Sequence, residues 1–170
     1  MAPPLRLAII GCGKIAEHHA RTVAEFEAAG RVQVAALVDP QPGRCDTVAA
    51  VLGGDRSQLV RLADLAALLA SKAPVDAVLI ATPHDLHEQI ATSALTAGLH
   101  VLLEKPLAPT LDACARLQAV AQTSTGLLVV SEQSPHWPEV AKAAQLISDG
   151  KIGEVVGATA DYYESMSRTP

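Results

Sequence analysis

Apolar runs without polar alternation recur along the chain and are typical of strands buried on both faces of a parallel sheet. The first run extends from Leu7 to Ile10 and stops at Gly11. A second doubly buried strand is predicted at 77–81, directly after a proline-broken stretch. Other strands are predicted at 32–38, 58–62, 100–103 and 127–130.

Stretches with helical periodicity separate these strands. Ile15, His19, Val23 and Phe26 stand near helical spacing and predict the inward face of an amphipathic helix. Further helices are predicted at 44–52, 65–69, 87–97, 110–123 and 138–149. Strands that alternate with helices predict an α/β fold with a doubly wound parallel sheet of the Rossmann type.

The predicted helix ends carry local signals. Asp64 and Thr110 precede helical stretches and are expected to cap them through their side-chain oxygens. Gly53, Gly98 and Gly150 follow helical stretches and are typical of helix ends.

The turn after the first strand contains the pattern Gly11-x-Gly13-x-x-Ala16. In a dinucleotide-binding turn, the first glycine makes the tight turn, the second leaves room for the pyrophosphate, and the small third residue lets the helix pack closely. Backbone N–H groups at Lys14 and Ile15 would then face the anion at the helix start. The alternative is a glycine-rich turn that serves ordinary packing.

A carboxylate follows the glycine turn at about the distance expected in a dinucleotide-binding domain. Asp39 ends the predicted strand at 32–38 and follows Ala16 by 23 positions, near the roughly 20 expected for the residue that holds the adenosine ribose. Because a carboxylate accepts both ribose hydroxyls and repels a 2′-phosphate, we predict NAD rather than NADP as the cofactor. Arg44 either softens this preference or is a solvated charge on the next helix.

Two more loops are predicted at the same sheet edge. One runs from Thr82 to Leu86, and the other contains Glu104, Lys105 and Pro106. Ligands of open α/β sheets bind at the carboxyl ends of the strands, where both loops begin. A lysine ammonium there can stabilise a developing alkoxide and relay a proton. The alternative is a surface lysine that follows a strand.

Composition narrows the class of protein. The 170 residues, 49% of them hydrophobic, fit one domain with a sizeable core. A net charge of −5 with scattered Lys and Arg argues against nucleic-acid binding. Three cysteines without C-x-x-C spacing suggest a reduced compartment. The first apolar run is too short for a signal peptide and no stretch reaches the length of a membrane span, so we expect a cytoplasmic protein without a membrane partner.

The end of the chain does not fit the predicted sheet. Residues 155–163 read V-V-G-A-T-A-D-Y-Y and have strand character. We expect them to form the first strand of a second, α+β domain. The predicted division is therefore a dinucleotide-binding Rossmann domain at 1–150 and the start of a truncated C-terminal substrate domain at 151–170.

Five segments together resemble the N-terminal half of the glucose-fructose oxidoreductase, inositol dehydrogenase and MocA (Gfo/Idh/MocA) family. The similarity covers nearly the whole chain. The threonine-proline loop followed by glutamate-lysine-proline is its distinctive part. The segments are G-C-G-K-I-A at 11–16, V-D-P at 38–40, A-T-P-H-D-L-H at 81–87, A-G-L-H-V-L-L-E-K-P-L-A at 97–108 and S-D-G-K-I-G-E-V at 148–155.

This resemblance implies an NAD(P)-dependent oxidoreductase that transfers a hydride between nicotinamide and a sugar, cyclitol or related polyol. It implies that Lys105 is the catalytic group at the substrate hydroxyl, in a loop shaped by Glu104 and Pro106. The same resemblance implies that Glu104 is also a cofactor-binding residue.

Other cofactor contacts are implied by the same resemblance. Thr82, Pro83 and His87 would hold the backbone on the cofactor side, although His87 is alternatively a helix-start residue satisfied by solvent. Gln133 would hydrogen-bond the carboxamide. Trp137 would either cover the nicotinamide ring or bury itself between two domains.

Relatives continue with a second domain that supplies a catalytic histidine and aspartate, substrate contacts and the usual oligomer interface. The isolated chain is therefore expected to bind NAD and to lack full turnover, with a homo-oligomer formed through that domain. The alternative is a non-catalytic NAD-binding module or a subunit that docks on a partner. The histidines His18, His19, His84 and His87 lack a convincing ligand set, so we predict no metal site.

Overall fold

The structure, a computed structural model, describes residues 3–161. The chain divides into two compact units, one ending at Ser131 and one beginning at Glu132. In the described part, no helix is long and apolar enough to cross a membrane.

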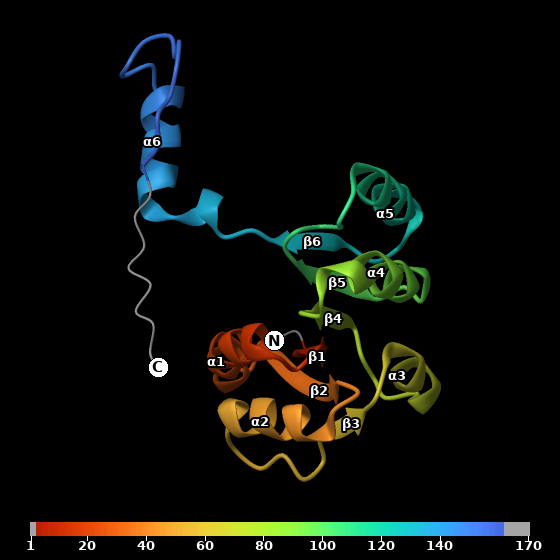
Figure 1. The fold of residues 1–170 in the computed structure, drawn as a ribbon. Helices are drawn as coiled ribbons and strands as arrows, with labels where there is room; N and C mark the ends of the chain where they lie inside the picture. The colour runs from red at the N-terminus through yellow and green to blue at the C-terminus, as the bar shows by residue number, and fades with distance from the viewer. Residues whose placement is uncertain (1–2, 162–170) are drawn as a thin grey trace, which may run out of the picture. The chain divides into compact units, whose positions relative to one another are not determined.

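The first unit contains six parallel strands in the order β3-β2-β1-β4-β5-β6 (Figure 1). This is the strand order of the doubly wound dinucleotide-binding fold, which confirms the predicted fold class. All six predicted strands are present, within two residues at each end. Their bounds are β1 (Leu5–Ile10), β2 (Val32–Val38), β3 (Val60–Leu62), β4 (Ala77–Ile80), β5 (His100–Glu104) and β6 (Leu128–Ser131).

Helices cover both faces of the sheet and form a core on each. Because successive side chains of a strand point to opposite faces, Leu7 and Ile9 of β1 pack on one face while Ala8 and Ile10 pack on the other. On the first face lie α1 (Lys14–Ala28) and α2 (Pro42–Leu52), and on the second lie α3 (Leu65–Ser71), α4 (His87–Thr96) and α5 (Leu111–Thr123) (Figure 1).

The predicted capping signals are confirmed. The Asp64 carboxylate accepts the N–H of Ala67 at 2.7 Å, and the Thr110 hydroxyl accepts the N–H of Ala113 at 3.2 Å. Gly53 follows α2 directly with a φ of 69°.

The predicted inward face of α1 is partly wrong. Val23 is buried as predicted, but Ile15 and Phe26 are exposed, and the helix buries Ala16 and Ala20 in their place. Small side chains take these positions because α1 packs closely on the strand that precedes it.

The second unit contains a short 3-10 turn, η2 (Ser134–His136), and α6 (Pro138–Ser148). The strand predicted at 155–163 is wrong over its described part, since residues 155–161 form no strand. A strand requires a hydrogen-bonded neighbour, and no described strand pairs with this segment. Tyr162 and Tyr163 lie outside the described residues. The predicted division of the chain at residue 150 stays a prediction.

Candidate functional site

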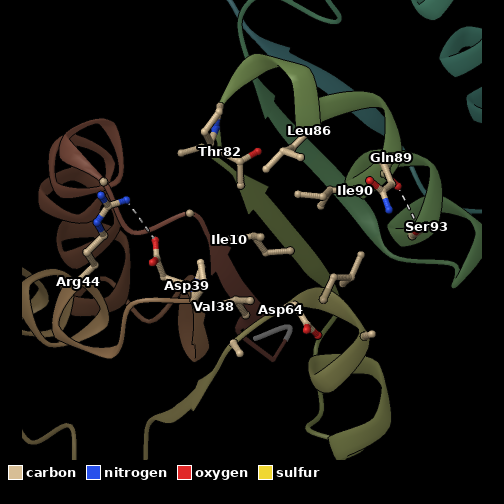
Figure 2. A pocket seen from close by; sticks show the side chains of 18 of the residues that line it. Ile10, Val38, Asp39, Arg44, Asp64, Thr82, Leu86, Gln89, Ile90 and Ser93 are labelled. Atoms are coloured by element: carbon tan, nitrogen blue, oxygen red, sulfur yellow. Dashed lines mark hydrogen bonds and ion pairs between the residues drawn. The ribbon is translucent and has the colours of Figure 1, made fainter.

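A cavity of about 930 Å³ lies at the carboxyl ends of the central strands. The strand order reverses between β1 and β4, and in open α/β sheets this switch point opens the crevice that binds ligands. The cavity is within the range of about 300–1,000 Å³ that is usual for small-molecule and cofactor sites. Figure 2 shows that its walls come from the ends of β1 and β2 and from α3 and α4.

Gly11 is required by the protein's own backbone. Its φ is 84°, and a Cβ there would lie 2.7 Å from the carbonyl carbon and oxygen of Ala81. The Gly11 N–H also donates to Val38 O at 2.8 Å. The turn after β1 is thus pressed between the ends of its two neighbouring strands.

Gly13 has no such requirement. Its φ is −84°, and a Cβ there would meet no atom within 4 Å. Gly13 is the N-cap of α1 and offers no side chain to the first turn, while Lys14 and Ile15 line the cavity with it. The start of a 15-residue helix therefore faces open space with its backbone donors uncapped by a side chain, which is the geometry that favours an anion.

Asp39 is held rigidly at the end of β2. It is 5% exposed, and its two carboxylate oxygens accept N–H groups from Cys12 at 2.9 Å and from Gln41 at 2.8 Å. Each oxygen retains a lone pair, and the residue lines the cavity. Arg44 Nη1 lies 4.0 Å from Asp39 Oδ2, with about half of its side chain exposed (Figure 2). This edge of the cavity can accept hydroxyl groups and carries a cation beside the acceptor.

Cys12 fills the space between the glycines as a small apolar residue. Burial raises the pKa of its thiol, and the nearby Cys45 thiol raises it further. Its Sγ faces Val38 O at 3.8 Å. A thiol kept protonated in this way is a poor nucleophile, so the side chain contributes packing.

Thr82 presents an unsatisfied hydroxyl. Its Oγ1 is buried and has no hydrogen-bond partner among the described residues. Thr82 lines the cavity with Pro83, at the end of β4 (Figure 2). Because a buried hydroxyl without a partner costs about 1–3 kcal/mol, a ligand that supplies one would be stabilised at this position.

An apolar wall of the cavity contains Ile15, a predicted cofactor residue, together with Leu69 and Leu86, which were not predicted as site residues. Ile15, Leu69 and Leu86 line the cavity although they are 52%, 42% and 38% exposed. Exposed apolar side chains gathered in one concave site are typical of a ligand-binding surface. The sequence signal was present for part of this wall, since Leu65 and Leu69 follow the carboxyl end of a predicted strand.

The Glu104–Pro106 loop begins at the carboxyl end of β5, the neighbour of β4. Lys105 is exposed, and its N–H donates to Glu104 Oε2 at 3.1 Å. Glu104 Oε1 lies 2.6 Å from Nε2 of His19 in α1. The peptide bond between Lys105 and Pro106 is cis. The loop is therefore tied to α1 through the glutamate.

His87 is completely buried at the start of α4. Its Nδ1 lies 2.8 Å from Pro106 O, and its Nε2 lies 3.1 Å from Thr82 O. The alternative in which solvent satisfies the ring is wrong, because the protein backbone surrounds both nitrogens.

The structure brings most of the predicted cofactor residues to one cavity. Those that line it are Gly11, Gly13, Lys14, Ile15, Asp39, Thr82 and Pro83. Those that do not line it are His87, Glu104 and Gln133, and the predicted catalytic residue Lys105 does not line it either. Gln133 belongs to the second unit, and its role stays a prediction. Within residues 3–161, no group of three or more His, Cys, Asp or Glu side chains is arranged to hold a metal ion.

Comparison with known proteins adds to this geometry. The model of the oxidoreductase family with an NAD-binding Rossmann fold (GFO_IDH_MocA) matches residues 5–132. A 1-carboxy-3-chloro-3,4-dihydroxycyclohexa-1,5-diene dehydrogenase of Comamonas testosteroni is 33% identical over 156 residues, which are 89% of this chain and 36% of the relative. An inositol 2-dehydrogenase of Saccharopolyspora erythraea is 34% identical over 153 residues, 89% of this chain and 44% of the relative.

Solved structures agree. The scyllo-inositol dehydrogenase of Lactobacillus casei, with bound NAD(H) and scyllo-inositol, matches with a TM-score of 0.75 and 27% identity over 89% of this chain and 43% of that chain. A 3-ketoreductase of Actinomadura kijaniata, in complex with TDP-benzene and NADP, matches with a TM-score of 0.73 and 34% identity over 89% of this chain and 44% of that chain. The chain spans less than half the length of each of these relatives. The chain belongs to the Gfo/Idh/MocA oxidoreductase family and carries the NAD-binding Rossmann fold of that family.

Proposed function

We propose that this chain is the nucleotide-binding part of an NAD(P)-dependent oxidoreductase that transfers a hydride between nicotinamide and a sugar, cyclitol or related polyol. The observation that carries the proposal is Gly13, where a side chain would meet no protein atom. Because Gly13 also lines the cavity at the start of α1, a ligand that approaches this position closely explains a glycine that neither backbone conformation nor packing requires.

The residues that line the cavity fit a dinucleotide along its length. The uncapped start of α1, at Gly13, Lys14 and Ile15, would hold the pyrophosphate with backbone N–H groups. Asp39 would accept the hydroxyls of the adenosine ribose. The apolar wall of Leu69 and Leu86 would pack against the adenine.

The end of β4 would hold the other half of the cofactor. The Thr82 hydroxyl, which has no partner among the described residues, would gain one there. Pro83 lines the same part of the cavity and fixes the course of the backbone. The bound nicotinamide would supply the hydride-accepting chemistry.

Asp39 favours NAD as the cofactor. Its buried carboxylate already accepts two backbone N–H groups, and a carboxylate at this position repels a 2′-phosphate. Arg44 opposes this preference, since a cation near the ribose accommodates the phosphate of NADP. The carboxylate is buried and the arginine is half exposed, so we infer that the preference for NAD is the stronger.

Lys105 is proposed as the polar group at the reacting carbon. Its ammonium would donate a hydrogen bond to the substrate oxygen and stabilise the charge that develops as the hydroxyl proton leaves. The exposed position of the lysine at the end of β5 leaves it available to a substrate. The relatives named as inositol dehydrogenases and a ketoreductase support a sugar or cyclitol substrate. A cytoplasmic location and a homo-oligomer stay predictions from the sequence.

Calorimetric titration of the full chain with NAD and with NADP tests the proposal. We expect heat of binding for both, tighter binding of NAD, and a rise in the melting temperature with NAD concentration, because a ligand that binds only the folded state stabilises it. An absence of both heat and thermal protection would contradict the cofactor assignment. Binding without turnover of polyols is expected of this chain under either hypothesis, so the discriminating measurement is polyol turnover after the chain is extended by a related second domain. Turnover there supports the oxidoreductase, and binding without turnover there supports a non-catalytic NAD-binding module.

A further inference from the structure

His87 occupies a position that cofactor binding does not explain. Its side chain is 0% exposed and does not line the cavity. A histidine ring is rarely buried completely unless its nitrogens are hydrogen-bonded. Both partners of this ring are backbone carbonyls, and they come from two different loops.

The two loops follow neighbouring parallel strands. Thr82, whose carbonyl lies 3.1 Å from Nε2, follows β4, and Pro106, whose carbonyl lies 2.8 Å from Nδ1, follows β5. The ring therefore spans the gap between the cofactor-lining loop and the loop that carries Lys105. No side chain of either loop is needed for this bridge.

The shorter of the two contacts is the one to Pro106. A carbonyl can only accept, and a neutral imidazole donates from one nitrogen alone. We therefore assign the proton of the neutral ring to Nδ1, which donates to Pro106 O. The contact of Nε2 with Thr82 O is a donated bond only in a ring that carries both protons.

The two chain neighbours of Lys105 are each hydrogen-bonded to a histidine of a helix. On one side, Glu104 accepts the Lys105 N–H and contacts His19 of α1. On the other side, Pro106 accepts from His87 of α4. Two histidines from different helices thus fix the two neighbours of a lysine whose own side chain is exposed.

We propose that His87 is a positioning residue for Lys105: its Nδ1–H holds the Pro106 carbonyl and so fixes the direction in which the lysine leaves β5. The inference rests on the proposed function, because the role of Lys105 in catalysis belongs to that proposal. Chemistry depends on such placement, since a displacement of about 1 Å can reduce a rate on the order of 100-fold.

Two conservative variants separate the contacts of the ring. The amide nitrogen of His87→Asn can take the place of Nδ1 and donate to Pro106 O. The amide nitrogen of His87→Gln can take the place of Nε2 and donate to Thr82 O. The control is His100→Asn, at the amino end of β5, where the ring accepts from the Leu127 N–H and an amide oxygen can do the same.

The readout is the backbone amide resonance of Lys105 in ¹⁵N-labelled full chain. We expect His87→Asn and His100→Asn to leave this resonance within a linewidth of its wild-type position, and His87→Gln to shift it. Equal shifts in His87→Asn and His87→Gln would mean that His87 has only a general packing role, and an unshifted resonance in His87→Gln would mean that the contact does not hold the loop. Either result overturns the proposal.

A measurement on the wild-type chain covers the case in which a variant does not fold. Long-range ¹⁵N–¹H spectra show which ring nitrogen of His87 carries a proton. A protonated Nδ1 supports the proposal, and an unprotonated Nδ1 overturns it. NAD titration of the wild-type chain reports separately on the proposed function, because the Lys105 and His87 resonances are read without cofactor.

Discussion

At the amino ends of the strands, charged side chains are paired with one another, whereas at the carboxyl ends some polar groups have no protein partner among the described residues. Arg6 and Asp76 join the starts of β1 and β4 through the arginine Nε, at 2.8 Å, and through a second guanidinium nitrogen. Arg56 pairs with Glu27 at 2.7 Å and donates to two carbonyls at the end of α2. The polar groups named at this edge satisfy one another.

At the carboxyl edge, two kinds of hydrogen-bonding group lack a side-chain partner. The Thr82 hydroxyl is buried without a partner among the described residues, and the start of α1 lacks a side-chain cap. Both edges belong to the same sheet, which has a core on each face, so stability does not demand this difference. Unused donors beside a cavity of about 930 Å³ indicate that the carboxyl edge is reserved for a ligand.

Within the carboxyl edge, two glycines of one turn separate what the fold needs from what a ligand needs, and the largest expected effect is on Gly11. Gly11→Ala should lower the free energy of unfolding by about 2–4 kcal/mol, because the new Cβ would press on the Ala81 backbone in a left-handed conformation. Urea unfolding measures this loss. The matched control is Gly13→Ala, where the Cβ meets nothing and φ is negative. Equal losses of unfolding free energy in Gly11→Ala and Gly13→Ala would contradict the conclusion that the fold requires glycine at 11 but not at 13.

Gly13→Val should weaken cofactor binding while leaving the stability of the fold unchanged. The branched side chain would enter the space proposed for the pyrophosphate and weaken NAD binding roughly 10- to 100-fold, the usual effect of overpacking a close contact. The free energy of unfolding without cofactor should stay near the wild-type value. Calorimetry measures the affinity, with Gly43→Val as control, since a Cβ at Gly43 also meets nothing and Gly43 does not line the cavity. Unchanged NAD affinity in Gly13→Val would remove the main support for the site.

Asp39 and Arg44 are a carboxylate and a cation at the same end of the cavity, and we expect them to have opposite effects on the choice between NAD and NADP. Asp39→Asn keeps an acceptor but removes the charge, so NAD binding should weaken about 10-fold, the effect of losing a charged hydrogen bond, while NADP loses less. Arg44→Ala should weaken NADP more than NAD. Parallel calorimetric titrations with NAD and NADP give the ratio of the two affinities for each variant. Equal losses of NAD and NADP in Asp39→Asn would show that the carboxylate does not face the 2′ position.

The strands and the caps could be predicted because their signals are local. The continuous apolar run from Leu7 to Ile10 is buried, as its pattern predicts. The Asp64 side chain caps a helix by accepting the N–H of Ala67, only three residues further along. The glycine pattern likewise located the turn, because its residues are close in the chain. Local sequence could therefore give the fold class and half of the cavity.

The remaining features depend on contacts between distant segments. His87 touches Pro106, 19 residues away, and Asp39 accepts from Cys12, 27 residues away. Helical spacing predicts that α1 faces inward through Ile15, His19, Val23 and Phe26, and Val23 is indeed buried. Close packing on β1, which the spacing does not reveal, buries Ala16 and Ala20 rather than Ile15 and Phe26. The segment 155–161 has strand-forming residues but no described partner. Such features follow from the assembled sheet and not from the pattern of any one segment.

The smallest expected effect lies at the paired edge. The Arg6 guanidinium, through its hydrogen bonds, lowers the pKa of Asp76 from 3.8 to about 2. A carboxylate whose pKa is lower in the folded state stabilises the fold above its ordinary pKa, and this stabilisation is lost as the pH falls from about 4 towards 2. Because both side chains are about a third exposed or more, the pair should contribute no more than about 1 kcal/mol.

Asp76→Asn should therefore lower the free energy of unfolding by up to about 1 kcal/mol at pH 7 and by nothing measurable near pH 2, where the wild-type carboxyl is itself protonating. Urea unfolding over this pH range measures the difference. A cycle with Arg6→Ala and the double variant isolates the pair from the other contacts of each residue. NAD affinity at pH 7 should be the same in all four proteins, because the pair lies at the edge where polar groups satisfy one another. A loss of NAD affinity in Asp76→Asn would show that the two edges of the sheet are coupled and that the paired edge also serves the ligand.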